Sequence, residues 1–168
     1  TLVTRQEIEG DPDHYRVIEV SDVAVSSPTG APDEVLQEQE DNGLLIRIGD
    51  EDVDDVSGVQ TYVVSYTLAG VVNSGVGAGG EDEIYWNLIS SDGFELPVSN
   101  VSVSLTGPEA PEQIACFTGA VGSGRQCSSH TVADGVATYR QDRLSDGAGL
   151  SVVASYPGGT FGGVQPIL

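Results

Sequence analysis

The residues best suited to metal chemistry form an acidic run, Asp50-Glu51-Asp52-Val53-Asp54-Asp55. Carboxylate oxygens at alternate positions suit Ca²⁺, and Asp50, Asp52 and Asp54 match the first three ligand positions of an EF-hand loop. The remaining positions do not fit, because Asp55 stands where that loop needs Gly and Thr61 stands where it needs Glu. We therefore expect a solvated acidic turn, with a Ca²⁺ site at these three aspartates as the alternative.

Two other patterns that could indicate catalysis or nucleotide binding are incomplete. The glycine-rich segment 75–80 superficially resembles a phosphate-binding loop, but no Lys-Ser/Thr pair follows it and acidic residues adjoin it. The only imidazoles belong to His14 and His130, and no Gly-x-Ser-x-Gly motif is present. Glycoside cleavage uses two carboxylates, but this chain has so many Asp and Glu residues that no particular pair is indicated as catalytic. We predict no catalytic residue and no enzymatic activity.

The two cysteines, Cys116 and Cys127, are flanked by Gly- and Ser-rich sequence typical of a loop. An even, minimal cysteine count favours one disulfide in an oxidising compartment. Zinc would need four ligands, and only two histidines are available to complete them. The sequence therefore predicts a disulfide that closes a surface loop and adds about 2–3 kcal/mol of stability.

The aromatic residues offer a possible sugar-binding surface. Trp86 shares a strand face with Ile84 and Leu88, so we expect it in the core. Tyr85 lies on the opposite face and is the better candidate for an exposed aromatic that binds a ligand such as cell-wall carbohydrate.

The charge balance excludes some partners. Twenty-six Asp and Glu residues face six Arg and no Lys, giving a net charge of -20. Such a chain repels nucleic acid and anionic membrane surfaces. Cations, basic surfaces and neutral ligands stay open as partners, although charge runs are most often solvated faces.

Alternating apolar residues indicate an all-β fold. In residues 60–69 one face carries Tyr62, Val64, Tyr66 and Leu68, and Ser65 and Thr67 lie on the other face. Similar alternation predicts strands over residues 15–25 (one long or broken strand), 44–48, 84–88, 101–105 and 150–156. The resulting core is expected to contain Val64, Tyr66, Leu68, Ile84, Trp86, Leu88, Val101, Val103, Leu105, Leu150 and Val152.

Turn signals separate these strands at intervals typical of a sandwich or barrel. Asp41-Asn42-Gly43 predicts a hairpin, because Asn-Gly readily takes the positive φ values of a tight turn. Segment 33–39 is too short for an independent helix and is interpreted as a strand. We predict one immunoglobulin-like β-sandwich domain over 1–160, with eight or nine mostly antiparallel strands, and a Gly/Pro-rich linker over 161–168 that leads toward a membrane segment.

Several segments together resemble the extracellular domain of the predicted bacterial membrane proteins called DUF2207, over about residues 15–159. The most specific are the Tyr85-Trp86-Asn87 cluster and the Cys116/Cys127 pair; the others are 27–32, 46–50, 61–70, 82–84, 96–98, 117–119, 122–123 and 149–152. The resemblance implies a signal peptide, this domain outside the cell, transmembrane helices and a low-complexity tail. It implies no established biochemical activity, and the opening strands usual in the family would be missing here.

These observations lead to one expected function. The chain is expected to be a non-catalytic extracellular module of a membrane-anchored envelope protein, tethered at the cell surface and not itself inserted in the membrane. Its role would be protein contact, sensing or envelope structure. The alternative is a ligand-binding module for calcium or cell-wall carbohydrate.

Overall fold

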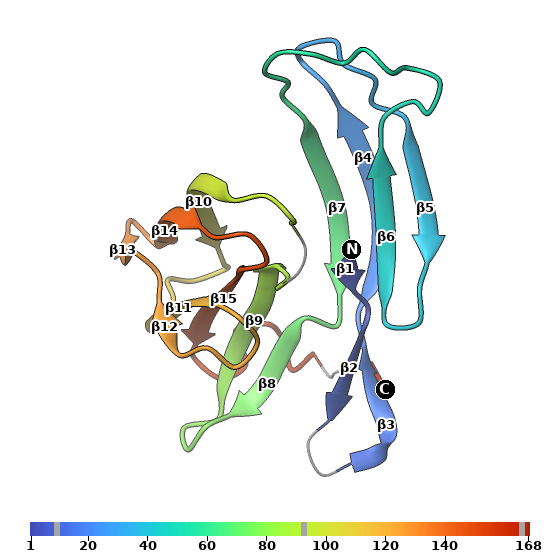
Figure 1. The fold of residues 1–168 in the computed structure, drawn as a ribbon. Coiled ribbons are helices and arrows are strands. Elements are labelled where there is room, and N and C mark those ends of the chain that lie inside the picture. The colour runs from blue at the N-terminus through green and yellow to red at the C-terminus, as the bar shows by residue number, and fades with distance from the viewer. Residues whose placement is uncertain (9–10, 92–93, 165–166) are drawn as a thin grey trace. The chain divides into compact units, whose positions relative to one another are not determined.

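The computed structural model describes residues 1–8, 11–91, 94–164 and 167–168, and within them it shows fifteen β-strands and no helix (Figure 1). All strand pairs are antiparallel, so the all-β sandwich class predicted from the sequence is confirmed, whereas the predicted strand count of eight or nine was too low. The contacts divide the chain into two compact units, where the sequence predicted one domain: unit 1 is Thr1–Gly70 with Ile167–Leu168, and unit 2 is Val71–Pro166.

Unit 1 contains seven strands in three small sheets: β1-β6-β5, β2-β3 and β4-β7. Among its described residues, Ile18 is the one apolar side chain that is fully buried, and the predicted core residue Val64 is 40% exposed. Val64 lies on a two-stranded sheet, which leaves it partly open to water, so its placement in the core was wrong. The strands are β1 Leu2–Val3, β2 Arg5–Ile8, β3 Asp11–Val17, β4 Glu19–Ser26, β5 Val35–Gln39, β6 Gly43–Ile48 and β7 Val63–Ala69.

The predicted hairpin joins β5 to β6, and its turn lies one residue earlier than Asn-Gly would suggest. Glu40 and Gly43 exchange both backbone hydrogen bonds, so Asp41 and Asn42 are the two turn residues. Gly43 instead permits a close approach, because a Cβ there would lie 2.6 Å from Thr1 Cγ2. Strand β1 pairs with β6 at this glycine, which explains why a side chain does not fit.

The long strand predicted over 15–25 is broken at the buried Ile18, between β3 and β4. Just before the break, Arg16 donates two hydrogen bonds to the Gly70 carbonyl, at 2.8 Å from Nε and 2.6 Å from Nη2. The next residue, Val17, forms a β-bridge with Ile167. The points where the chain leaves and re-enters unit 1 are therefore both held at the end of β3.

Unit 2 is a sandwich of two antiparallel sheets, in the orders β12-β11-β15-β9-β8 and β10-β14-β13 (Figure 1). The glycine-rich segment 75–80 begins in the edge strand β8, and residues 77–80 form the turn that follows it. The immunoglobulin-like arrangement stays a prediction. The strands are β8 Val72–Val76, β9 Glu81–Ile89, β10 Val98–Thr106, β11 Gln113–Gly119, β12 Arg125–Gln126, β13 Ser129–Ala133, β14 Val136–Leu144 and β15 Gly149–Tyr156.

The inner face of the five-stranded sheet carries the core of unit 2. Trp86, Val152 and Cys116 form one row across β9, β15 and β11, and all three are buried. Tyr139 of the opposing sheet is fully buried and donates a hydrogen bond of 2.8 Å to the Val153 carbonyl. Burial, and secondly the nearby Tyr156, raises the pKa of Tyr139 to about 12. Of the predicted core of this unit, Leu150 is also buried, and Ile84, Leu88, Val101, Val103 and Leu105 are half-buried.

The segment after β15 is tied to the fold. Phe161 packs edge-on against Tyr156, with ring centroids 5.1 Å apart, and its backbone N–H donates to the buried carboxylate of Asp82. Further on, Ile167 pairs with Val17 in unit 1. Residues 161 and 167 therefore make specific contacts that the sequence-based prediction of a linker did not include.

Candidate functional site

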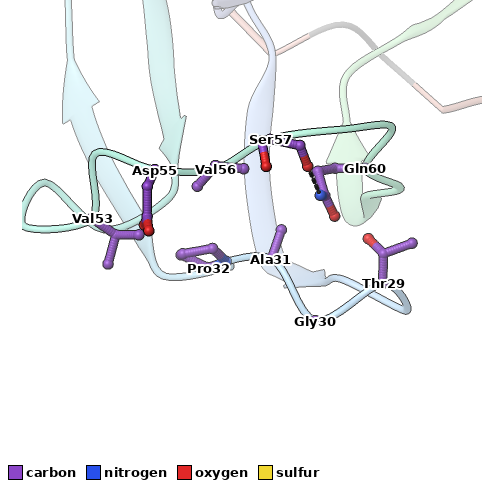
Figure 2. A pocket seen from close by; sticks show the side chains of 9 residues that line it. All are labelled: Thr29, Gly30, Ala31, Pro32, Val53, Asp55, Val56, Ser57 and Gln60. Atoms are coloured by element: carbon purple, nitrogen blue, oxygen red, sulfur yellow. Dashed lines mark hydrogen bonds between the residues drawn. The ribbon is translucent and has the colours of Figure 1, made fainter.

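Two loops of unit 1 form a groove, a concave surface that lies entirely within the described residues. One wall is the turn after β4, residues 29–32, and the other is the long connection from β6 to β7, where residues 53–60 contribute (Figure 2). Its volume is about 270 Å³. Such a volume falls below the range of sites that enclose a whole small ligand, so it suits one side chain or the edge of a partner.

Hydrogen bonds at the end of β4 fix the two loops against each other. The Ser27 hydroxyl donates to the Thr61 carbonyl at 3.0 Å, and the Thr61 N–H donates to Thr29 Oγ1 at 3.1 Å. The same Ser27 oxygen accepts a 3.1 Å hydrogen bond from the Ala31 N–H. Short hydroxyl side chains bond readily to nearby backbone groups, which explains why Ser and Thr occupy this turn. The groove thus has a fixed base.

The walls of the groove are apolar at one end and polar at the other. Val56 projects from the upper loop toward Pro32 and Ala31 of the lower loop, and Val53 lies beside them (Figure 2). Val53 and Val56 are 38% and 46% exposed, so water reaches both. An occupant that covered them would gain apolar burial.

Gln60 and Thr29 form the polar end (Figure 2). The Gln60 side-chain N–H donates to the Ser57 carbonyl at 2.6 Å, which fixes the direction of the amide. Gln60 Oε1 is shielded from water and has no hydrogen-bond partner in the described part of the chain. A shielded acceptor without a donor is costly, so a ligand donor placed there would be favoured.

The acidic run borders this groove, and Asp55 is one of the lining residues. The three aspartates predicted as calcium ligands are distributed along the loop: Asp50 Oδ1 accepts the Asp52 N–H at 2.9 Å, and Asp52 and Asp54 are exposed. Within residues 1–8, 11–91, 94–164 and 167–168, no group of three or more His, Cys, Asp or Glu side chains is arranged to hold a metal ion. The structure therefore does not bring these three residues together as a ligand set.

Cys116 and Cys127 form a disulfide, with their Cα atoms 5.5 Å apart. The bond closes the β11-β12 hairpin, in which the Cys127 N–H donates to the Cys116 carbonyl at 3.1 Å. Cys116 is fully buried and Cys127 is 9% exposed. The disulfide is therefore buried in the core of unit 2, whereas the loop that it closes contains the exposed Val121.

Tyr85 lies in the middle of β9, opposite Val153 of β15, and is 41% exposed. Its exposure agrees with the sequence analysis; a ligand-binding role stays a prediction. On the same strand face, the Ser151 hydroxyl donates to Asn87 Oδ1 at 2.6 Å.

The two histidines lie in different surroundings. His14 Nδ1 is 2.9 Å from Asp11 Oδ2 on the exposed strand β3 of unit 1, and His130 belongs to β13 of unit 2. The His14 and Asp11 side chains are 57% and 41% exposed, so this pair lies on the surface of the unit.

The groove was not found from the sequence, although two signals for it were present. Its two valines, Val53 and Val56, lie three residues apart on a long irregular connection, and Pro32 lies in the turn after β4. Neither signal says that the two loops meet, because that contact depends on the pairing of β4 with β7.

Comparison with known protein families finds one that matches this chain. The family model described as "Predicted membrane protein (DUF2207) N-terminal domain" matches residues 3–156, most of the chain. The chain belongs to this family. No curated protein matches the DUF2207 chain, and no solved structure matches it. Among the residues described here, we find no helix with the length and hydrophobicity of a membrane span.

Proposed function

We propose that this DUF2207 domain is a non-catalytic, outward-facing module of a membrane-anchored protein of the bacterial envelope, which contacts a protein or another envelope component. The family description supports the membrane association. The groove of unit 1 provides a surface for contact, because it exposes apolar side chains on a loop pair fixed by hydrogen bonds.

The observation that carries the outward placement is the Cys116–Cys127 disulfide. Cytosolic proteins rarely keep structural disulfides, because glutathione and thioredoxin hold thiols reduced, whereas extracellular domains use them routinely. Burial of Cys116 protects the bond from exchange, as expected of a structural and not a redox-active pair.

The redox state of these cysteines in the cell tests the proposal. A full-length protein in which Cys116 and Cys127 are the only cysteines is acid-quenched and treated under denaturing conditions with a polyethylene-glycol maleimide, with or without prior reduction. We expect no mobility shift before reduction and a two-adduct shift after it. Two adducts without reduction would contradict the outward placement.

Tyr85 supports a second candidate function, binding of cell-wall carbohydrate. Its exposed ring on β9, with the Ser151–Asn87 hydrogen-bonded pair on the same sheet face, combines an aromatic surface with polar groups. Binding of soluble peptidoglycan fragments to the chain, with loss of that binding in Tyr85→Ala, would support this function. Equal binding by the two proteins, or none, would count against it.

A further inference from the structure

We propose that the groove of unit 1 binds the side chain of an arginine from a basic segment of a partner protein. The inference rests on the contact role proposed above and specifies the chemistry of the partner. It is carried by three features of the groove: the acidic charge at its border, the apolar wall, and an acceptor at its polar end that has no partner among the described residues.

The charge around the groove is acidic. Residues 29–34 and 50–60 contain seven carboxylates and no Lys or Arg. The arginine closest to them in sequence, Arg47, pairs with Glu38 on β5 at 3.2 Å. A cationic segment would therefore be attracted to this surface, whereas a second copy of the same acidic chain would be repelled. The acidic residues are Asp33, Glu34, Asp50, Glu51, Asp52, Asp54 and Asp55.

The shape of the groove suits a side chain that is apolar along its stem and charged at its head. Arginine covers apolar surface with its methylene groups while the guanidinium stays near water and carboxylates. Here Val53, Val56 and Pro32 form the apolar wall, and Asp55 lies among them (Figure 2). A purely apolar occupant would leave Asp55 without a counter-charge, and a small cation would leave the valines uncovered.

Gln60 supplies the third requirement. Its Oε1 has no donor among the described residues, while one N–H of its Nε2 donates to the Ser57 carbonyl. The amide therefore offers an occupant an acceptor whose direction is fixed. Guanidinium has five N–H donors and no acceptor, so it suits Gln60 Oε1 at the polar end, while the negative charge of Asp55 at the apolar end attracts the cation.

The test is an NMR titration of the purified chain with N-acetyl-arginine amide at 150 mM NaCl, where long-range attraction between exposed charges is largely screened. N-acetyl-citrulline amide serves as the neutral ligand of the same shape. We expect shifts confined to 29–32, 53–60 and the Gln60 side-chain amide, with a dissociation constant on the order of millimolar. We expect citrulline to produce no saturable shift.

Two matched variants distinguish arginine binding in the groove from nonspecific attraction to an acidic protein. Asp55→Asn is expected to weaken arginine binding about two- to five-fold, and Asp146→Asn, which removes the same charge from an exposed turn of unit 2, should leave it unchanged. Shifts scattered over many acidic segments, equal effects of the two variants, or equal binding of citrulline would overturn the inference. If arginine did not bind but the disulfide were intact in cells, the groove proposal would be wrong and the outward placement would still hold. The two experiments therefore test the two proposals separately.

Discussion

Loss of the Cys116–Cys127 bond should destabilise unit 2 by an amount set by the loop that it closes. The two residues are separated by 11 positions, and the chain-entropy relation gives about 3 kcal/mol for a loop of that length. For a unit the size of Val71–Pro166, this corresponds to a lower thermal midpoint by on the order of 10–20 °C. The double variant Cys116→Ala, Cys127→Ala loses this constraint together with buried sulfur contacts.

Differential scanning calorimetry of the oxidised protein, the reduced protein and the double variant measures the effect. The reduced protein keeps both sulfur atoms, so it isolates the contribution of the bond from that of packing. We expect both altered forms to lose about 3 kcal/mol or more, with the transition of unit 1 unmoved. If reduction lowered the stability of unit 2 by less than about 1 kcal/mol, the reasoning from loop closure would be refuted.

Further predictions concern the buried tyrosines and the acidic loop. Tyr139→Phe removes the hydroxyl that donates to the Val153 carbonyl and should cost about 1–2 kcal/mol in urea unfolding. Tyr156→Phe removes a buried hydroxyl with no partner in the described residues and should cost nothing, so equal losses in the two variants would contradict this reasoning. The raised pKa of Tyr139, about 12 when folded against 10.0 as the ordinary value, means that the unfolded chain releases this proton first. Stability should therefore be complete below pH 10 and fall by about 2–3 kcal/mol between pH 10 and 12, less steeply in Tyr139→Phe; a decline equally steep in that variant would assign the effect to other groups. Millimolar Ca²⁺ should leave the thermal midpoint unchanged relative to Mg²⁺, because the predicted ligands are not gathered, and a rise specific to Ca²⁺ would restore the calcium site.

Strand positions were largely predictable from the sequence, because alternation of apolar side chains is a local signal. Segments 84–88, 101–105 and 150–156 lie within β9, β10 and β15, and Trp86 is buried as expected. The turn between β13 and β14 is formed by Asp134 and Gly135, which both have positive φ, as the residue types of this pair favour.

Pairing between distant strands could not be predicted in the same way. Period-two alternation says which side chains share a face, but not which sheet covers that face. Val64 shows the consequence, since its pattern matches that of Val152, yet it is 40% exposed and Val152 is 4% exposed. The groove escaped prediction for the same reason, because it exists only where two loops meet after β4 pairs with β7.

The outward placement of the DUF2207 domain is tested most directly by labelling one exposed position in intact cells. Val59 is 92% exposed, so a cysteine introduced there, Val59→Cys, should be accessible without disturbing the fold. In the full-length protein we expect a membrane-impermeant biotin-maleimide to label this cysteine in intact cells as fully as in lysed cells. Labelling that appears only after lysis would contradict the proposed function.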